Sequence, residues 1–245
     1  MVVRFKAIVE YDGTAYKGFQ RQLEQPTVQG ALEQTINHVT GQNPTVIGAG
    51  RTDSGVHAQG QVIAIDLEWR HGTEALLRAL NSNLPIDIAI MTLSEADKDF
   101  HPRFNAKRRI YQYWIYNGSV RSPLRHLQTW HVAQPLDIHR MASAANMLVG
   151  VQDFATFGQP PTGSITVRQV YYSDWRRQDE YLIYKIEANA FLYRMVRSLV
   201  GSMKSVGEGA WTVEDFVAAK DACDRSRAAT TAPAHGLVLD SVIYD

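Results

Sequence analysis

The chain has 245 residues and a mass of 27.5 kDa, with 45% hydrophobic and 20% charged residues, a composition typical of one large or two small globular domains rather than of a disordered protein. Its 25 Lys and Arg residues balance its 25 Asp and Glu residues, which argues against a protein whose whole surface is electropositive. The single cysteine, Cys223, excludes an intramolecular disulfide and a paired-cysteine zinc site. No signal-peptide pattern and no run of about 18 apolar residues occurs, so we expect a cytoplasmic protein without membrane insertion.

The first half of the chain predicts elements in the order β-α-β-β-α-β. Thr27 is suited to begin a helix as its N-cap, apolar residues then recur at spacings of 3, 4 and 7, and Gly41 is suited to end it. Alternating or continuous apolar runs bounded by turn residues predict the strands. We expect strands at 5–13, 45–50, 58–69 and 86–94, and a second helix at 73–80.

The second half predicts the order β-α-β-β-α-α-β. Asp137 is the expected N-cap of a helix that ends at Gly150. The pattern therefore indicates a duplicated α+β unit with antiparallel strands and flanking helices, divided into residues 1–105 and 106–245. Further elements are expected as strands at 109–118, 166–175, 181–190 and 236–244 and as helices at 192–206 and 213–222.

The balanced total charge hides two acid-free stretches. Residues 100–136 hold six basic and no acidic side chains, and residues 188–205 hold three basic and no acidic ones. The first stretch interleaves its basic residues with aromatic ones, which suits phosphate neutralisation and base stacking by single-stranded or splayed RNA. The alternative is that the aromatic residues are the core of a strand whose basic residues are solvated. The candidate RNA contacts are Arg103, Lys107, Arg108 and Arg109.

Common catalytic and nucleotide-binding motifs are absent from the sequence. It contains no GxGxxG, GxxxxGK[ST], GxSxG or HExxH pattern and no cysteine cluster. His126 and His131 are the closest approach to a metal pattern, but they lack neighbouring carboxylates. We therefore expect no metal and no cofactor.

The stretch GAGRTDSGVHAQGQV, residues 48–62, places four glycines around Arg51 and Asp53. Asp53 is the only carboxylate between Glu33 and Asp66. A lone carboxylate near a cation stays ionised and can act as a nucleophile or a base. The structural alternative is a turn aspartate that caps backbone amides beside an incidental arginine.

A third feature is ANAFLYRMVRSLVGSM, residues 188–203. Phe191, Met195, Leu199 and Met203 recur at helical spacing, which predicts one buried helix face. Arg197 lies beside that face and can be presented from a protein wall, although the pattern does not decide where its side chain points.

Seven segments in order resemble the tRNA pseudouridine synthase A family. The resemblance covers essentially the whole chain, and GRTDSGVHA alone is similar to the catalytic loop of that family. The segments are EYDGTAYKGFQRQ (10–22), GAGRTDSGVHAQGQV (48–62), NSNLPIDIAI (81–90), FHPRFNAKRRIYQY (100–113), LVGVQDFATF (148–157), ANAFLYRMVRSLVG (188–201) and APAHGLVL (232–239).

The resemblance implies a pseudouridine synthase fold and specific residue roles. Asp53, in the N-terminal half, matches the catalytic nucleophile, and Arg51 matches the arginine that helps displace the target nucleotide. In the C-terminal half, Tyr111 matches the tyrosine that stacks on the target base, and Arg197 matches the arginine that pairs with the aspartate. Leu237 matches an apolar residue that lines the base pocket.

The implied reaction converts uridine to pseudouridine at positions 38 to 40 of the tRNA anticodon stem-loop, without a cofactor, in a homodimer. A stacked base is out of reach, so the nucleotide must be flipped out. The carboxylate can add covalently or can stabilise cationic character at C1′ after deprotonation at C2′, and the sequence leaves both routes open. A noncatalytic tRNA-binding protein and a pseudouridine synthase that acts on another RNA remain the alternatives.

Overall fold

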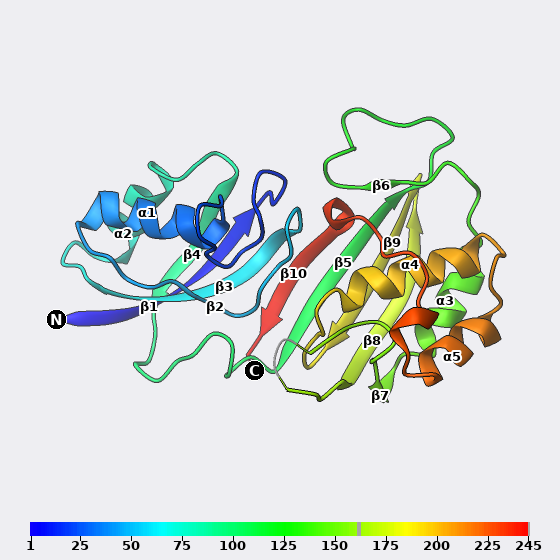
Figure 1. Ribbon diagram of the computed structural model, residues 1–245. Coiled ribbons are helices and arrows are strands. Elements are labelled where there is room, and N and C mark those ends of the chain that lie inside the picture. The colour runs from blue at the N-terminus through cyan, green and yellow to red at the C-terminus, as the bar shows by residue number, and fades with distance from the viewer. Residues whose placement is uncertain (161–162, 245) are drawn as a thin grey trace. The chain divides into compact units, whose positions relative to one another are not determined.

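The computed structural model describes residues 1–160 and 163–244 and divides them into two compact units (Figure 1). The first is Met1–Lys107 with the chain from Leu239 onward, and the second is Arg108–Val238. The boundary expected after residue 105 lies two residues from the observed change. The end of the chain differs from the expectation, because the last strand packs on the first unit: a Cβ added to Gly60 would stand 2.4 Å from the Asp240 carbonyl oxygen.

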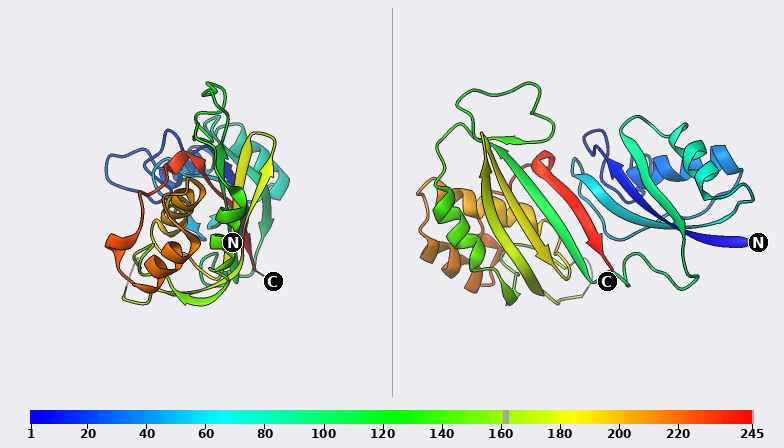
Figure 2. Two further views of the ribbon diagram at one scale, coloured as in Figure 1. Left: turned by 90° about the vertical axis from the view of Figure 1, so that its right-hand side faces the viewer. Right: turned by 180° about the vertical axis from the view of Figure 1, so that it is seen from behind.

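The first unit is an antiparallel sheet covered on one face by two helices (Figure 2). The strand order is β4-β1-β3-β10, with the short β2 paired to β3. Side chains of β1 alternate between exposed or half-buried and buried, as a strand with one covered face requires. The elements are β1 (Val2–Tyr11), α1 (Val28–Thr40), β2 (Ile47–Gly48), β3 (His57–Glu68), α2 (Thr73–Asn81), β4 (Ile88–Glu95) and, from Leu239 onward, β10 (Leu237–Ile243), whose first two residues belong to the second unit.

The ends of α1 follow from its capping residues, as predicted. The Thr27 side chain accepts a hydrogen bond from the Gly30 amide, and Gly41 ends the helix in the left-handed region at φ 70°. Leu32 and Ile36 of this helix are each 1% exposed and form part of the core.

The second unit has the strand order β5-β9-β8-β7, with neighbours antiparallel, and a short β6 parallel to β5. Three α-helices cover one face of these strands (Figure 2). The elements are β5 (Arg108–Tyr116), β6 (Trp130–His131), α3 (Ile138–Asn146), β7 (Gly150–Asp153), β8 (Val167–Gln178), β9 (Tyr181–Ala188), α4 (Met195–Gly207), α5 (Val213–Asp221), and the 3-10 helices η1 (Arg225–Arg227) and η2 (Ala234–Gly236).

Two helix boundaries differ from the sequence prediction. The helix capped by Asp137 ends at Asn146, and Gly150 instead begins β7 with a φ of 111°. The helix expected from residue 192 begins at Met195, because Arg194 adopts a left-handed conformation at φ 61° and interrupts the helical path. The short strands β6 and β7 were not predicted.

The α+β class, with mostly antiparallel strands and flanking helices in both halves, is confirmed. In the part of the chain that the structure describes, no helix is both long enough and apolar enough to cross a membrane.

Candidate active site

The glycine-rich loop of the first unit joins β2 to β3 and is fixed at both ends. The Gln61 side-chain amide donates to the Gly50 carbonyl at 3.0 Å, and the Val56 amide donates to the Asp53 carbonyl at 3.1 Å. The Asp53 side chain is half-buried and Arg51 is exposed. The loop therefore presents its carboxylate from a constrained backbone.

The segment after β1 holds this loop from the side. The Phe19 amide donates to the Thr52 carbonyl at 3.1 Å, and the Gly55 amide donates to the Tyr16 carbonyl at 3.3 Å. Gly18 has a φ of 96°, and a Cβ at that position would stand 2.7 Å from the Thr52 carbonyl oxygen. Only a glycine allows this approach, so the segment after β1 packs directly against the backbone of the loop.

A buried hydroxyl pair lies under the loop. Tyr11 Oη and Thr52 Oγ1 are 2.8 Å apart, and both residues are buried. Burial raises the pKa of the Tyr11 phenol to about 12, although hydrogen bonds from Thr52 and Gln61 oppose the rise. The phenol therefore stays neutral at physiological pH and anchors the residue next to Asp53.

In the second unit, Tyr111 lies on β5 opposite Ile186 of β9. The Phe191 ring meets the Tyr111 ring edge to face, with centroids 5.0 Å apart and planes at 85°. Phe191 was expected on the buried face of the following helix, which is wrong because α4 begins only at Met195. The rest of that face is confirmed: Met195, Leu199 and Met203 are buried.

Arg197 lies in the first turn of α4 and is held by a neighbouring segment. Its Nε donates to the Ala232 carbonyl at 2.8 Å, and the Ala232 amide donates to the Arg197 carbonyl at 3.0 Å. The Tyr113 hydroxyl donates to the Pro233 carbonyl at 2.8 Å, and Leu237, which is 6% exposed, follows at the start of β10.

Tyr113 connects this segment to the strand that carries Tyr111. Burial raises the pKa of the Tyr113 phenol, and the positive charge of Arg197 opposes that rise. A Cβ added to Gly236 would stand 2.6 Å from the ring of Tyr113. The structure therefore brings Arg197 and the segment that leads to Leu237 together around Tyr113.

The predicted catalytic and substrate-binding residues form two groups, one in each unit: Arg51 and Asp53 in the first, and Tyr111, Arg197 and Leu237 in the second.

The sequence does not reveal which residues hold the candidate site residues in place. Tyr11, Gly18 and Thr52 support the loop of Asp53, and Tyr113 supports the segment of Arg197. The sequence signals for Tyr11 and Gly18 lie in the run YDGTAYKGF, and Thr52 lies in the glycine-rich stretch itself, but neither pattern shows that these residues meet. Contacts across 41 residues, as between Tyr11 and Thr52, leave no local pattern.

The basic residues proposed to contact RNA have different surroundings. Arg108 pairs with Glu187 at 2.7 Å, and Arg109 donates to the Asn189 carbonyl at 2.9 Å. Arg103 and Lys107 are exposed, and the Arg103 guanidinium lies 5.7 Å from the centre of the Phe104 ring. The charge of Arg108 is therefore partly neutralised within its own unit.

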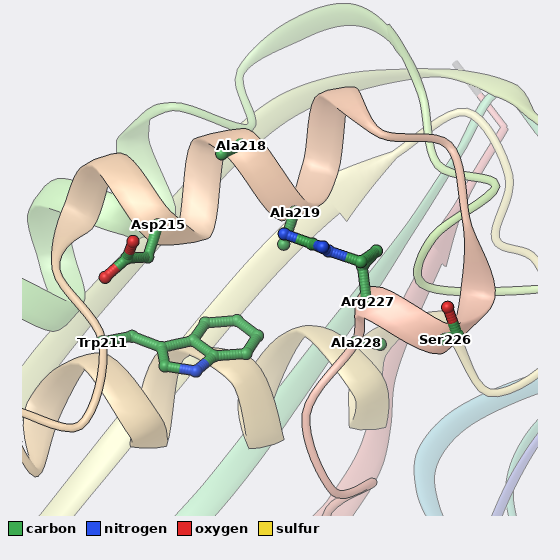
Figure 3. A pocket seen from close by; sticks show the side chains of 7 residues that line it. All are labelled: Trp211, Asp215, Ala218, Ala219, Ser226, Arg227 and Ala228. Atoms are coloured by element: carbon green, nitrogen blue, oxygen red, sulfur yellow. The ribbon is translucent and has the colours of Figure 1, made fainter.

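A cavity of about 500 Å³ lies between α5 and η1 in the second unit (Figure 3). None of the predicted site residues lines it, and the Asp215 carboxylate at its edge already accepts a hydrogen bond from the Thr212 amide as part of a helix cap. Its lining residues are Trp211, Asp215, Ala218, Ala219, Ser226, Arg227 and Ala228. This cavity therefore contributes nothing to the candidate active site.

The described residues contain no group of three or more His, Cys, Asp or Glu side chains placed to hold a metal ion. His126 and His131 contact the backbone carbonyls of Pro123 and Gly118, respectively.

Comparisons with known proteins agree in the family they indicate. The family described as tRNA pseudouridine synthase matches residues 7–105 and 144–245. A tRNA pseudouridine synthase A of Pseudothermotoga lettingae is 42% identical over 98% of this chain and 99% of that protein. A protein of the same name from Caulobacter sp. (strain K31) is 40% identical over 99% of this chain and 98% of its own length. Another from Brevibacillus brevis is 40% identical over 98% of this chain and 99% of its own length.

A structural comparison gives a much weaker similarity. The crystal structure of a Cbf5-Nop10-Gar1 complex matches 82% of this chain and 44% of the compared chain, at 14% identity and a TM-score of 0.35. At that score the similarity supports no argument.

Proposed function

Because the chain belongs to the tRNA pseudouridine synthase family and is an isomerase that acts on tRNA, we propose that it uses Asp53 to convert uridine to pseudouridine at positions 38 to 40 of the anticodon stem-loop. The observation that carries the proposal is the packing around Asp53. A half-buried carboxylate lies on a loop that is held by the Tyr11–Thr52 hydroxyl pair and by the close approach of Gly18. Such preorganisation suits a group that must meet one reacting atom.

The reaction breaks the N1–C1′ bond, turns the uracil over and forms a C5–C1′ bond. The C5 proton passes to solvent and N1 takes up a proton, so the product is an isomer of the substrate. Asp53 acts either as a nucleophile or as the stabiliser of positive charge at C1′. The target nucleotide leaves the base stack, at a cost of roughly a few kcal/mol. Stacking on Tyr111, whose ring is oriented by Phe191, offsets part of that cost.

The remaining site residues complete the proposed arrangement. Arg197 supplies the positive partner of Asp53, Arg51 helps displace the nucleotide, and Leu237 lines the pocket for the base. The acid-free stretch supplies the phosphate contacts, with Arg103 and Lys107 the most exposed of its four candidates. A homodimer that binds tRNA across both subunits is part of the same proposal and rests on the family resemblance. The cytoplasmic location in the proposal rests on the sequence, which has no signal-peptide pattern.

The test is Asp53→Asn, assayed by tritium release from C5-labelled uridine in tRNA. We expect release to fall to background while tRNA binding is retained, because the substitution removes the charge and keeps the shape. Asp66→Asn is the matched control. Asp66 lies on β3 of the same unit, outside the glycine-rich loop, and pairs with Arg4 of β1. Release near the wild-type rate from Asp53→Asn would refute the assignment.

Two further measurements separate the alternatives. A wild-type protein that binds tRNA but releases no tritium would favour the noncatalytic reading. Mapping of pseudouridines in total RNA from a deletion strain identifies the target, and loss at sites other than positions 38 to 40 would show a different RNA specificity.

A further inference from the structure

Residues 225–232 form a strap over the first two turns of α4. The strap starts in η1, and its Ala229 amide donates to Ser202 Oγ at 3.2 Å. It then returns to the beginning of the helix, where Ala232 exchanges two hydrogen bonds with Arg197. The residue proposed to pair with the catalytic aspartate is therefore oriented by the strap.

The strap lies against the helix at a distance that only glycine permits. A Cβ added to Gly201 would stand 1.8 Å from the Thr230 carbonyl oxygen. Gly201 follows Arg197 by one helical turn, so both residues face the strap. The strap is therefore in direct contact with the turn of α4 that carries Arg197.

Arg225 fastens the beginning of the strap. Its Nη1 donates to the Thr156 carbonyl and to Ser198 Oγ, both at 3.0 Å. Ser198 and Thr156 are both 0% exposed, and Ser198 is the residue next to Arg197. Thr156 Oγ1 in turn donates to the Ala219 carbonyl of α5, so one guanidinium ties the strap, α4 and α5 together.

We propose that Arg225 is a positioning residue that acts through Arg197, because it fixes the strap whose Ala232 carbonyl orients the Arg197 side chain. The inference rests on the proposed role of Arg197 in the reaction. An arginine side chain has several rotatable bonds, and holding its Nε to one carbonyl restricts where the charge can lie. Loss of Arg225 leaves Arg197 present but less well oriented, so turnover should suffer more than binding.

The experiment is a double-mutant cycle with Arg225→Met and Arg197→Ala. We expect Arg225→Met to lower kcat about 10-fold with the tRNA Kd changed less than about 2-fold. In the Arg197→Ala background the same substitution should lower kcat less than about 2-fold further, because the group that it positions is gone. Arg227→Met is the matched control in the same 3-10 helix. Arg227 lines the cavity of Figure 3, so its substitution should leave kcat unchanged.

Ser198→Ala provides a second test if Arg225→Met fails to fold. It removes one acceptor of the same guanidinium, and we expect a loss of about 3-fold in kcat that also disappears in the Arg197→Ala background. Multiplicative losses in the double mutants, or a raised tRNA Kd for Arg225→Met, would overturn the inference. Failure of the proposed function is distinguishable, because it would appear as activity retained in Asp53→Asn.

Discussion

The contact between Gly18 and the loop of Asp53 makes a quantitative prediction for Gly18→Ala. The new Cβ would stand 2.7 Å from the Thr52 carbonyl oxygen and 3.3 Å from the Asp53 carbonyl carbon. These neighbours are backbone atoms, so no flexible side chain can move aside. A retreat of the loop by about 0.7 Å is needed to bring the first distance from 2.7 to 3.4 Å, an ordinary van der Waals contact.

Two effects add in this variant. An alanine at a φ of 96° costs about 1 to 2 kcal/mol, and the overpacking costs about 1 to 3 kcal/mol more. The displacement acts directly on the backbone of Asp53. Since a misplacement of about 1 Å can cost about 100-fold in rate, we expect kcat to fall about 10- to 100-fold.

Gly41→Ala is the matched control because Gly41 also has a positive φ, of 70°, but a Cβ there meets nothing within 4 Å. We expect it to lower the free energy of unfolding by about 1 kcal/mol and to leave kcat unchanged. Urea denaturation and tritium release should be measured on both variants under one set of conditions. Equal kcat values for Gly18→Ala and Gly41→Ala would refute the reasoning, as the two variants differ chiefly in the contact with the loop.

Three other predictions follow from single contacts. Tyr11→Phe should lower the free energy of unfolding by about 1 kcal/mol, because it leaves the buried Thr52 hydroxyl without its phenol partner; an unchanged urea midpoint would contradict this. The hydrogen bond and charge of Arg4 hold the pKa of Asp66 below its ordinary value, so the pair stabilises the fold above about pH 3.9 and loses that contribution as the pH falls through the lower, folded pKa. The free energy of unfolding of Asp66→Asn should therefore fall less steeply with decreasing pH than that of the wild type. Parallel curves of unfolding free energy against pH below pH 4 for the two proteins would rule out the linkage. Lys107→Ala should weaken tRNA binding and reduce the slope of log K against log salt concentration by about 0.7 to 0.9. Arg108→Ala should reduce this slope less, because Glu187 already pairs with Arg108. Equal slopes for the two variants would contradict the expected difference between Lys107 and Arg108.

Elements whose signals are local could be predicted from the residues alone. The helix from Thr27 to Gly41 was predicted at both ends, because side-chain capping and a left-handed glycine act within one turn. The Asp137 cap was predicted for the same reason. The isolation of Asp53 in a glycine-rich loop was also visible, since it depends only on residue order.

Local patterns failed where a backbone conformation was set by distant contacts. The periodicity of apolar residues predicts that α4 begins at residue 192, but it begins at Met195 because Arg194 takes a left-handed conformation. Phe191 therefore lies outside the helix and packs on Tyr111. The helix after Asp137 was expected to use Gly150 as its stop, but Gly150 belongs to a strand that pairs with β8. A strand partner at the sheet edge is not encoded within the segment itself.

The residues that support the candidate catalytic side chains could be identified only from the fold. Gly18 and Tyr11 hold the loop of Asp53 from more than 30 residues away, and the strap beyond Arg225 holds Arg197 from about 30 residues further along the chain. These contacts depend on how close two backbones approach, which residue type and spacing do not reveal. The sequence therefore indicated which residues are candidates for the chemistry, and the packing of distant segments determined how firmly each is held.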